Sequence, residues 1–285
     1  MSTKLAFNQQ LRNRRKKQKQ KRTAFLMLLF VIILILLIVI VNSFLKGSDN
    51  KNSSKNTIAN EYIYPMPKER AQDVILNLNT SDGIKTAYLT FDDGPNTTTT
   101  PIILDTLRKY NIKATFFTVG NLLDKNPDIS RRIYDEGHLL ANHSYTHKYN
   151  ELYASGDSFM NEVVSTHEKI VSITEKKNYP KFFRFPGGSY KDNSQYSNAK
   201  QEYKELLNDN GFYYCDWNAL TGDAEKTNLT KDYLMKRIKE TSKGKEDIVV
   251  LMHDFTSKKV SADVLPQVVE YLISQGYTFD TLDNI

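Results

Sequence analysis

Short apolar runs and helical patterns alternate regularly from residue 85 to the end of the chain. The runs are rich in β-branched and aromatic residues, and the segments between them repeat their apolar residues at helical spacing. Predicted strands cover 86–91, 114–119, 138–142, 182–185, 212–218, 247–253 and 277–281. Strands that alternate with helices build parallel sheets, so the pattern predicts an α/β domain with seven strands. An open doubly wound sheet and a barrel both fit this pattern.

The segments between the predicted strands carry recognisable helix ends. Pro101 is typical of a first helical position, with Thr100 before it as a candidate N-cap. Ser158 or Asp157 is predicted to begin a long helix. Glycines predicted to end helices are Gly137 (after 128–136), Gly211 (after 198–210) and Gly276 (after the last helix).

A long apolar run near the start of the chain predicts a membrane anchor. Residues 24–41 contain no charged or polar side chain, and as a helix they nearly span a hydrocarbon core of roughly 30 Å. A cleaved signal peptide is the alternative, but its apolar core is usually shorter and ends in small residues. Here the run continues as VNSFLKG, so the sequence favours a retained transmembrane helix over 23–44.

Charge is distributed unevenly along the chain. Residues 1–22 contain nine basic residues and no acidic one, which leaves 30 basic against 33 acidic residues in 23–285. The folded part therefore lacks the positive charge expected of a nucleic-acid-binding protein. The basic segment instead indicates a cytoplasmic tail, which places everything beyond the membrane helix outside the cell. The polar residues at the start of 45–84 suit a stalk, with a lead-in segment after them, and 85–285 is the predicted folded domain.

Two adjacent carboxylates follow the first predicted strand. Asp92 and Asp93 are followed by Gly94 and Pro95, which favour a tight turn. Successive strand residues point to opposite faces, so one carboxylate can bind a metal ion while its neighbour accepts a proton. Taken alone, the motif fits an ordinary turn equally well.

A pair of histidines follows the third predicted strand. His143 and His147 are four residues apart, and on a helical turn that spacing puts both imidazoles on one side. Two surface histidines would show the same spacing. With Asp93 they make a set of three ligands that leaves positions open for water, as in catalytic zinc sites.

Two further strand ends carry charged side chains. His253 ends the strand predicted over 247–253, and we interpret it as a general acid. Arg184 closes the fourth predicted strand, where it would keep one of the two carboxylates ionised. His138 and His167 lie away from this end of the predicted strands and receive no role.

Four motifs in this order resemble one family: TFDDGP (90–95), HSYTH (143–147), RFPGG (184–188) and LMHD (251–254). They are similar to those of the polysaccharide deacetylases of the NodB-homology type, carbohydrate esterase family 4. The resemblance implies a distorted (β/α) barrel with seven strands. The roles that it implies are catalytic base for Asp92, metal ligands for Asp93, His143 and His147, contact with Asp92 for Arg184, general acid for His253 and acetyl-methyl pocket for Leu251.

The chain departs from the family pattern after the fifth strand. The family often has Asp-x-x-Asp-Trp there, whereas this chain has Leu220 and Ala224 around Asp223. The way in which Arg184 is held is therefore open, and Trp217 is either structural or a platform for the sugar. The predicted pocket consists of Gly187, Leu251, Trp217 and Asp223.

The resemblance implies a hydrolase that removes N-acetyl groups from amino sugars of a cell-wall glycan. N-acetylglucosamine of peptidoglycan is the first choice of substrate, and N-acetylmuramic acid, chitin oligomers and poly-N-acetylglucosamine are alternatives. The expected cofactor is a divalent metal ion, Zn²⁺ first, with Co²⁺ or Mn²⁺ as alternatives. A membrane-tethered glycan-binding protein without turnover is the competing hypothesis.

Overall fold

The computed structural model describes residues 73–78, 83–192 and 194–285, all within the unit Ile58–Ile285. The predicted tail over 1–22, the predicted membrane helix over 23–44 and most of the segment over 45–84 lie outside these residues. Within the described ranges, every helix is too short or too polar to span a bilayer.

Eight parallel strands form one curled sheet in the described part of the chain. They are β1 (Lys85–Asp92), β2 (Thr115–Thr118), β3 (Leu139–Asn142), β4 (Phe182–Phe183), β5 (Tyr213–Tyr214), β6 (Ala219–Leu220), β7 (Asp247–His253) and β8 (Tyr277–Phe279). The order is β5-β4-β3-β2-β1-β7-β6, and β8 pairs with the first residues of β1. All seven predicted strands are present, although those predicted over 182–185 and 212–218 have only two residues each, and β6 was not predicted.

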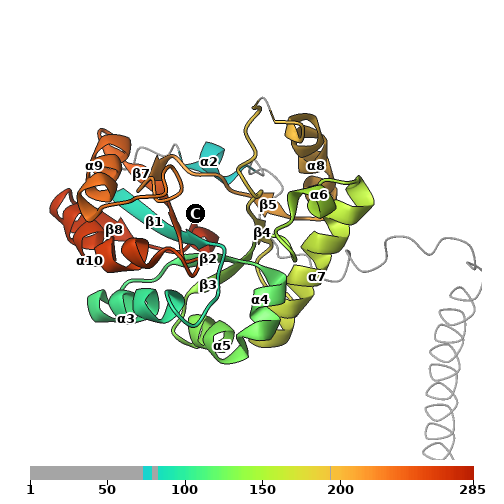
Figure 1. Cartoon of the computed structure of the whole chain (residues 1–285), viewed down its shortest axis with the longest axis horizontal. Coiled ribbons are helices and arrows are strands. Elements are labelled where there is room, and N and C mark those ends of the chain that lie inside the picture. Colours follow the sequence, from blue (N-terminus) through green and yellow to red (C-terminus); the bar gives the residue numbers. More distant parts are fainter. Residues whose placement is uncertain (1–72, 79–82, 193) are drawn as a thin grey trace, which may run out of the picture. The chain divides into compact units, whose positions relative to one another are not determined.

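The curl leaves an open side between the edge strands β5 and β6. The chain leaves the sheet after Tyr214 because the next two carbonyl groups, of Cys215 and Asp216, accept hydrogen bonds from Arg184. The lead-in segment contacts this edge, since Asp73 pairs with Tyr214 and α2 (Val74–Asn77) follows at once. Figure 1 shows α2 on this open side. The fold is therefore a parallel α/β half-barrel, a more open form of the seven-stranded barrel that we expected.

Helices surround the strands on the outside (Figure 1). They are α3 (Thr100–Tyr110), α4 (Gly120–Lys125), α5 (Pro127–Asp135), α6 (Tyr149–Leu152), α7 (Gly156–Thr174), α8 (Ser197–Asp209), α9 (Lys231–Ser242) and α10 (Lys259–Ser274), followed by the 3₁₀ turn η2 (Leu282–Asn284). Two predicted caps were wrong. Thr100 is the first residue of α3 rather than its cap, and α7 begins earlier than predicted because the Ser155 side chain accepts the Ser158 N–H.

The central strands are buried on both faces. β1 pairs with β7 in register from Thr86 to Asp92, and the last six residues of β1 are buried. Such strands read as continuous apolar runs because helices or other chain segments cover both sides. A second, mostly aromatic cluster, which includes Phe159, Phe183 and Phe185, packs beneath α7 and α8. The polar residues lie where β1, β3, β4 and β7 end.

Candidate active site

The site begins where β1 ends. Asp92 is the last residue of β1 and is almost fully buried, whereas Asp93 has left-handed backbone geometry with φ of +78°. This change in backbone direction lets Asp92 contact Arg184 while Asp93 faces His143 and His147. Gly94 is required next, because a side chain there would overlap the carboxylate of Asp254.

His143 and His147 lie in a loop rather than on the helical turn that we predicted. Ser144 and His147 have left-handed backbone angles, which a helix does not allow. The loop is held from outside by Glu162 of α7, whose carboxylate accepts hydrogen bonds from the backbone N–H groups of Tyr145 and Thr146 at 2.8 Å each. The two imidazoles still lie side by side, with ring centroids 4.9 Å apart.

Asp93 and the two histidines form one compact group of metal-binding atoms. Asp93 Oδ1 lies 3.5 Å from His143 Nε2 and 3.2 Å from His147 Nε2. Two ligands of a tetrahedral zinc ion, each about 2 Å from the metal, lie about 3.3 Å apart, so the spacing fits such an ion. Within the described ranges, this is the one set of three histidine, cysteine or acidic side chains with metal-ligand geometry.

The protonation of the group also suits a metal ion. His143 Nδ1 lies 2.8 Å from the carbonyl oxygen of Arg184, and donation to that oxygen leaves Nε2 free as the ligand atom. Burial, together with the neighbouring His143, lowers the pKa of His147 and favours its neutral form. Burial alone would raise the pKa of Asp93, but the nearby imidazoles, His143 first, hold it well below its usual range. The ionised carboxylate of Asp93, the neutral imidazole of His147 and the free Nε2 of His143 therefore offer atoms that a metal ion can bind.

Arg184 is fully buried beside Asp92. Its Nη1 donates to Asp92 Oδ1 at 2.9 Å and to Thr90 Oγ1 at 2.6 Å. Its Nε and Nη2 donate to the carbonyl oxygens of Cys215 and Asp216, both at 2.8 Å. Arg184 is therefore held by backbone carbonyl groups on this side of its guanidinium, although the chain departs from the family pattern after the fifth strand.

His253 ends β7 next to Asp92 in the sheet register. Its Nδ1 lies 2.8 Å from Asp223 Oδ1, and its backbone N–H donates to Asp223 Oδ2 at 2.8 Å. Burial lowers the pKa of His253, but the contact with Asp223 outweighs burial and raises the pKa to about 9. The imidazole is therefore protonated at neutral pH. Asp223, which we predicted in the pocket, is buried, and both of its carboxylate oxygens contact His253.

The Asp223→Asn variant is expected to lose activity at a lower pH than the wild type. If His253 is the general acid that the sequence predicts, it works while it is protonated, and activity falls as the pH rises through its pKa. The amide removes the negative charge that raises this pKa, so the pKa moves toward the ordinary imidazole value of about 6.5. The measurement is kcat/KM against pH, with Asp263→Asn on α10 as a control. An unchanged alkaline limb would contradict the pairing of Asp223 with the acid.

The remaining predicted pocket residues lie around the same end of the strands. Trp217 has its ring 5.7 Å from the Arg184 guanidinium, and the same ring occupies the space that a side chain at Gly188 would need. Gly187 has φ of +76°, and Leu251 lies in β7 opposite Thr90. These positions put them beside Asp92 and its partners.

Several site residues were not predicted. Glu162 and Thr90 support the loop and Arg184, as described above, and Asp254 is buried beneath Gly94 with its Oδ2 accepting from Thr100 Oγ1 at 2.6 Å. Burial raises the pKa of Asp254 to about 7. Its place directly after His253, as the last residue of the LMHD motif, was the signal in the sequence.

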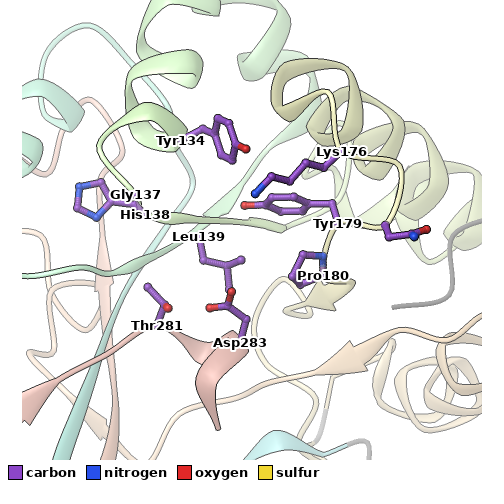
Figure 2. Close-up of a pocket in the computed structure, with 10 residues that line it drawn as sticks. Tyr134, Gly137, His138, Leu139, Lys176, Tyr179, Pro180, Thr281 and Asp283 are labelled. Atoms are coloured by element: carbon purple, nitrogen blue, oxygen red, sulfur yellow. The ribbon is translucent and has the colours of Figure 1, made fainter. Parts of the chain in front are cut away.

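A hollow of about 300 Å³ lies at the opposite end of the strands (Figure 2). Its lining includes His138 and Leu139 at the start of β3 and Pro180 just before β4. His138 accepts the N–H of Ala114, and burial lowers its pKa to about 3. It therefore packs as a neutral core residue.

The chain is similar in sequence to known polysaccharide deacetylases. The family model described as polysaccharide deacetylase matches residues 79–206. The chain is 33% identical over 199 residues to a peptidoglycan-N-acetylglucosamine deacetylase of Bacillus cereus, covering 69% of this chain and 68% of that protein. The chain belongs to the polysaccharide deacetylase family. The resemblance seen in the sequence is thereby confirmed, and the protein is an enzyme of the polysaccharide deacetylase class.

Two further matches extend the comparison. The peptidoglycan-N-acetylmuramic acid deacetylase PdaA of Bacillus subtilis is 30% identical over 204 residues, with 70% of this chain and 71% of that protein covered. The solved catalytic domain of a peptidoglycan N-acetylglucosamine deacetylase from Eubacterium rectale superposes with a TM-score of 0.64 at 32% identity. That superposition covers 71% of this chain and 90% of the domain. The chain therefore shares its half-barrel fold with this catalytic domain.

Proposed function

We propose that this polysaccharide deacetylase removes N-acetyl groups from the amino sugars of peptidoglycan, with N-acetylglucosamine as the preferred unit and a divalent metal ion as cofactor. The observation that carries the proposal is the meeting of three elements at one end of the sheet. These are a compact ligand set of Asp93, His143 and His147, the buried carboxylate of Asp92, and the imidazole of His253 paired with Asp223.

The ligand set favours zinc, because one carboxylate and two imidazoles with open positions suit a catalytic Zn²⁺, while Co²⁺ and Mn²⁺ are the alternatives. When bound, such an ion supplies Lewis-acid chemistry and lowers the pKa of water. His143 Nε2, His147 Nε2 and Asp93 Oδ1 would hold it.

The residues of the chain carry the proton transfers. Asp92, held by Arg184, accepts a proton from the water whose oxygen attacks the acetamide carbon. The N–H of Gly187 donates to the carbonyl oxygen as it gains negative charge. His253 gives its proton to the nitrogen as the C–N bond breaks. Acetate and a free amino sugar are the products.

Substrate and location are inferred from the relatives and from the sequence. The Bacillus cereus relative and the Eubacterium rectale structure are named for N-acetylglucosamine, and PdaA for N-acetylmuramic acid. Both sugars belong to peptidoglycan, which an extracellular domain reaches if residues 23–44 form the predicted membrane anchor. A cytoplasmic tail and a stalk complete the proposed arrangement.

The test uses the full-length, zinc-loaded chain in detergent with purified peptidoglycan. Mass spectrometry of the resulting muropeptides is expected to show loss of an acetyl group, and fragmentation locates it on N-acetylglucosamine. Loss from N-acetylmuramic acid instead would replace the proposed substrate. Binding to the glycan without acetate release from peptidoglycan or chitooligosaccharides would favour the non-catalytic glycan-binding protein.

A further inference from the structure

Tyr149 lies beside the metal-ligand group and has no role in the mechanism above. It is the first residue of α6, two residues after His147. Its ring stands edge-on to the His147 imidazole, with centroids 5.8 Å apart and planes at 81°. The rings of Tyr153 and Tyr196 pack against it at 5.7 and 5.8 Å. The side chain is therefore fixed in place by aromatic contacts.

The hydroxyl of Tyr149 is in contact with Gly187. A Cβ atom added at Gly187 would lie 2.7 Å from Tyr149 Oη, so the phenol oxygen fills the space where a side chain would begin. Gly187 is the residue whose N–H we assign to the carbonyl oxygen of the substrate. The phenol O–H and this backbone N–H thus belong to the same wall of the site.

Neither donor has an acceptor among the residues that the structure describes. Their neighbours are different. The hydroxyl of Tyr153 donates to the carbonyl oxygen of Pro186 at 3.0 Å, and the N–H of Gly188 donates to that of Phe185 at 2.7 Å. The loop is held by these bonds, which leaves the Tyr149 O–H and the Gly187 N–H available to a ligand.

We propose that the Tyr149 hydroxyl is a second donor to the acetamide carbonyl oxygen, acting together with the Gly187 N–H as that oxygen gains negative charge. The proposal rests on the proposed deacetylation. The phenol donates a hydrogen bond and keeps its proton, because Asp92 and His253 carry the two protons that move. Donors fixed in advance around a developing charge stabilise the transition state more than the ground state, so the contribution is to kcat.

A purely structural role would not require the hydroxyl. Phenylalanine would make the same ring contacts with His147, Tyr153 and Tyr196. The Tyr149→Phe variant therefore separates the two roles, since it removes one O–H and retains the ring. Tyr196→Phe is the matched control, because Tyr196 lies in the same aromatic cluster and is not part of the site.

The experiment measures acetate release from a chitooligosaccharide, zinc affinity and thermal unfolding for the full-length chain and both variants. Tyr149→Phe is expected to lower kcat by about 10²-fold, the lower end of the effect of removing one oxyanion donor, with little change in KM. Its zinc affinity and unfolding temperature are expected to match the wild type, and Tyr196→Phe is expected to keep wild-type activity.

Three results would overturn the proposal. The first is wild-type kcat in Tyr149→Phe. The second is a loss of zinc affinity as large as the loss of activity, which would mean that the hydroxyl only supports His147. The third is an equal loss in Tyr196→Phe, which would make it an effect of packing. If the zinc-loaded wild type releases no acetate from any glycan, the proposed deacetylation fails and this role fails with it.

Discussion

Replacing His147 by alanine is expected to abolish zinc binding and acetate release together. The variant leaves two ligands, Asp93 and His143, where the wild type offers three. A bound ion contributes several kcal/mol to the transition state, so activity should fall by at least about 10³-fold. Zinc content after dialysis and acetate release from a chitooligosaccharide are the two measurements. Chelation of the wild type is expected to give the same loss, reversed by added zinc.

The matched control is Lys148→Ala, which changes the next residue of the same loop. Lys148 is exposed and pairs with Glu151 at 2.9 Å, away from the ligand atoms. Exposed pairs of this kind contribute little to stability, so both zinc content and activity should stay at the wild-type level. A His147→Ala variant that binds one zinc ion per chain and still releases acetate would remove His147 from the ligand set. Reloading the chelated wild type with Co²⁺ or Mn²⁺ tests the alternative ions.

The candidate ligand set was accessible from the sequence because Asp93 and His143 directly follow strand ends that the apolar pattern marks, and His147 comes four residues after His143. Parallel strands bring their carboxyl ends to one edge, so residues distant in the chain, such as Asp93 and His253, could be placed together. The shape of the loop from His143 to His147 could not be predicted in this way. Its conformation depends on Glu162, which comes from α7 and carries no local signal in the sequence.

The contact between Asp223 and His253 could not be predicted from the sequence either. The family pattern marked the position of Asp223, but the contact of this residue with His253 depends on the register between β6 and β7. β6 has only two residues, too few for an apolar period to show. The half-barrel was likewise hidden, because the turn of the chain after Tyr214 depends on hydrogen bonds from Arg184. In each case a tertiary hydrogen bond, rather than local propensity, decided the outcome.

Replacing Asp92 by asparagine is expected to remove activity and leave the metal site intact. Asparagine has nearly the same shape as aspartate but cannot accept the proton of the attacking water, so kcat should fall by about 10²–10⁴-fold. Asp92 is outside the set of three ligands, and its Oδ2 lies 3.8 Å from His143 Nε2. Zinc content should therefore match the wild type, which distinguishes this variant from His147→Ala.

Stability has to be measured with this variant, because Asp92 is the carboxylate partner of a fully buried arginine. Loss of one member of a buried ion pair commonly destabilises a protein by about 3–5 kcal/mol. The introduced asparagine can still accept the hydrogen bond of Arg184 at its amide oxygen, so the effect should lie below this range. Activity is then compared at a temperature where thermal unfolding shows both proteins to be folded. Asp263→Asn on α10 is the control, since it makes the same change from carboxylate to amide outside the site. Folded, zinc-loaded Asp92→Asn with wild-type kcat would show that a different group accepts the proton.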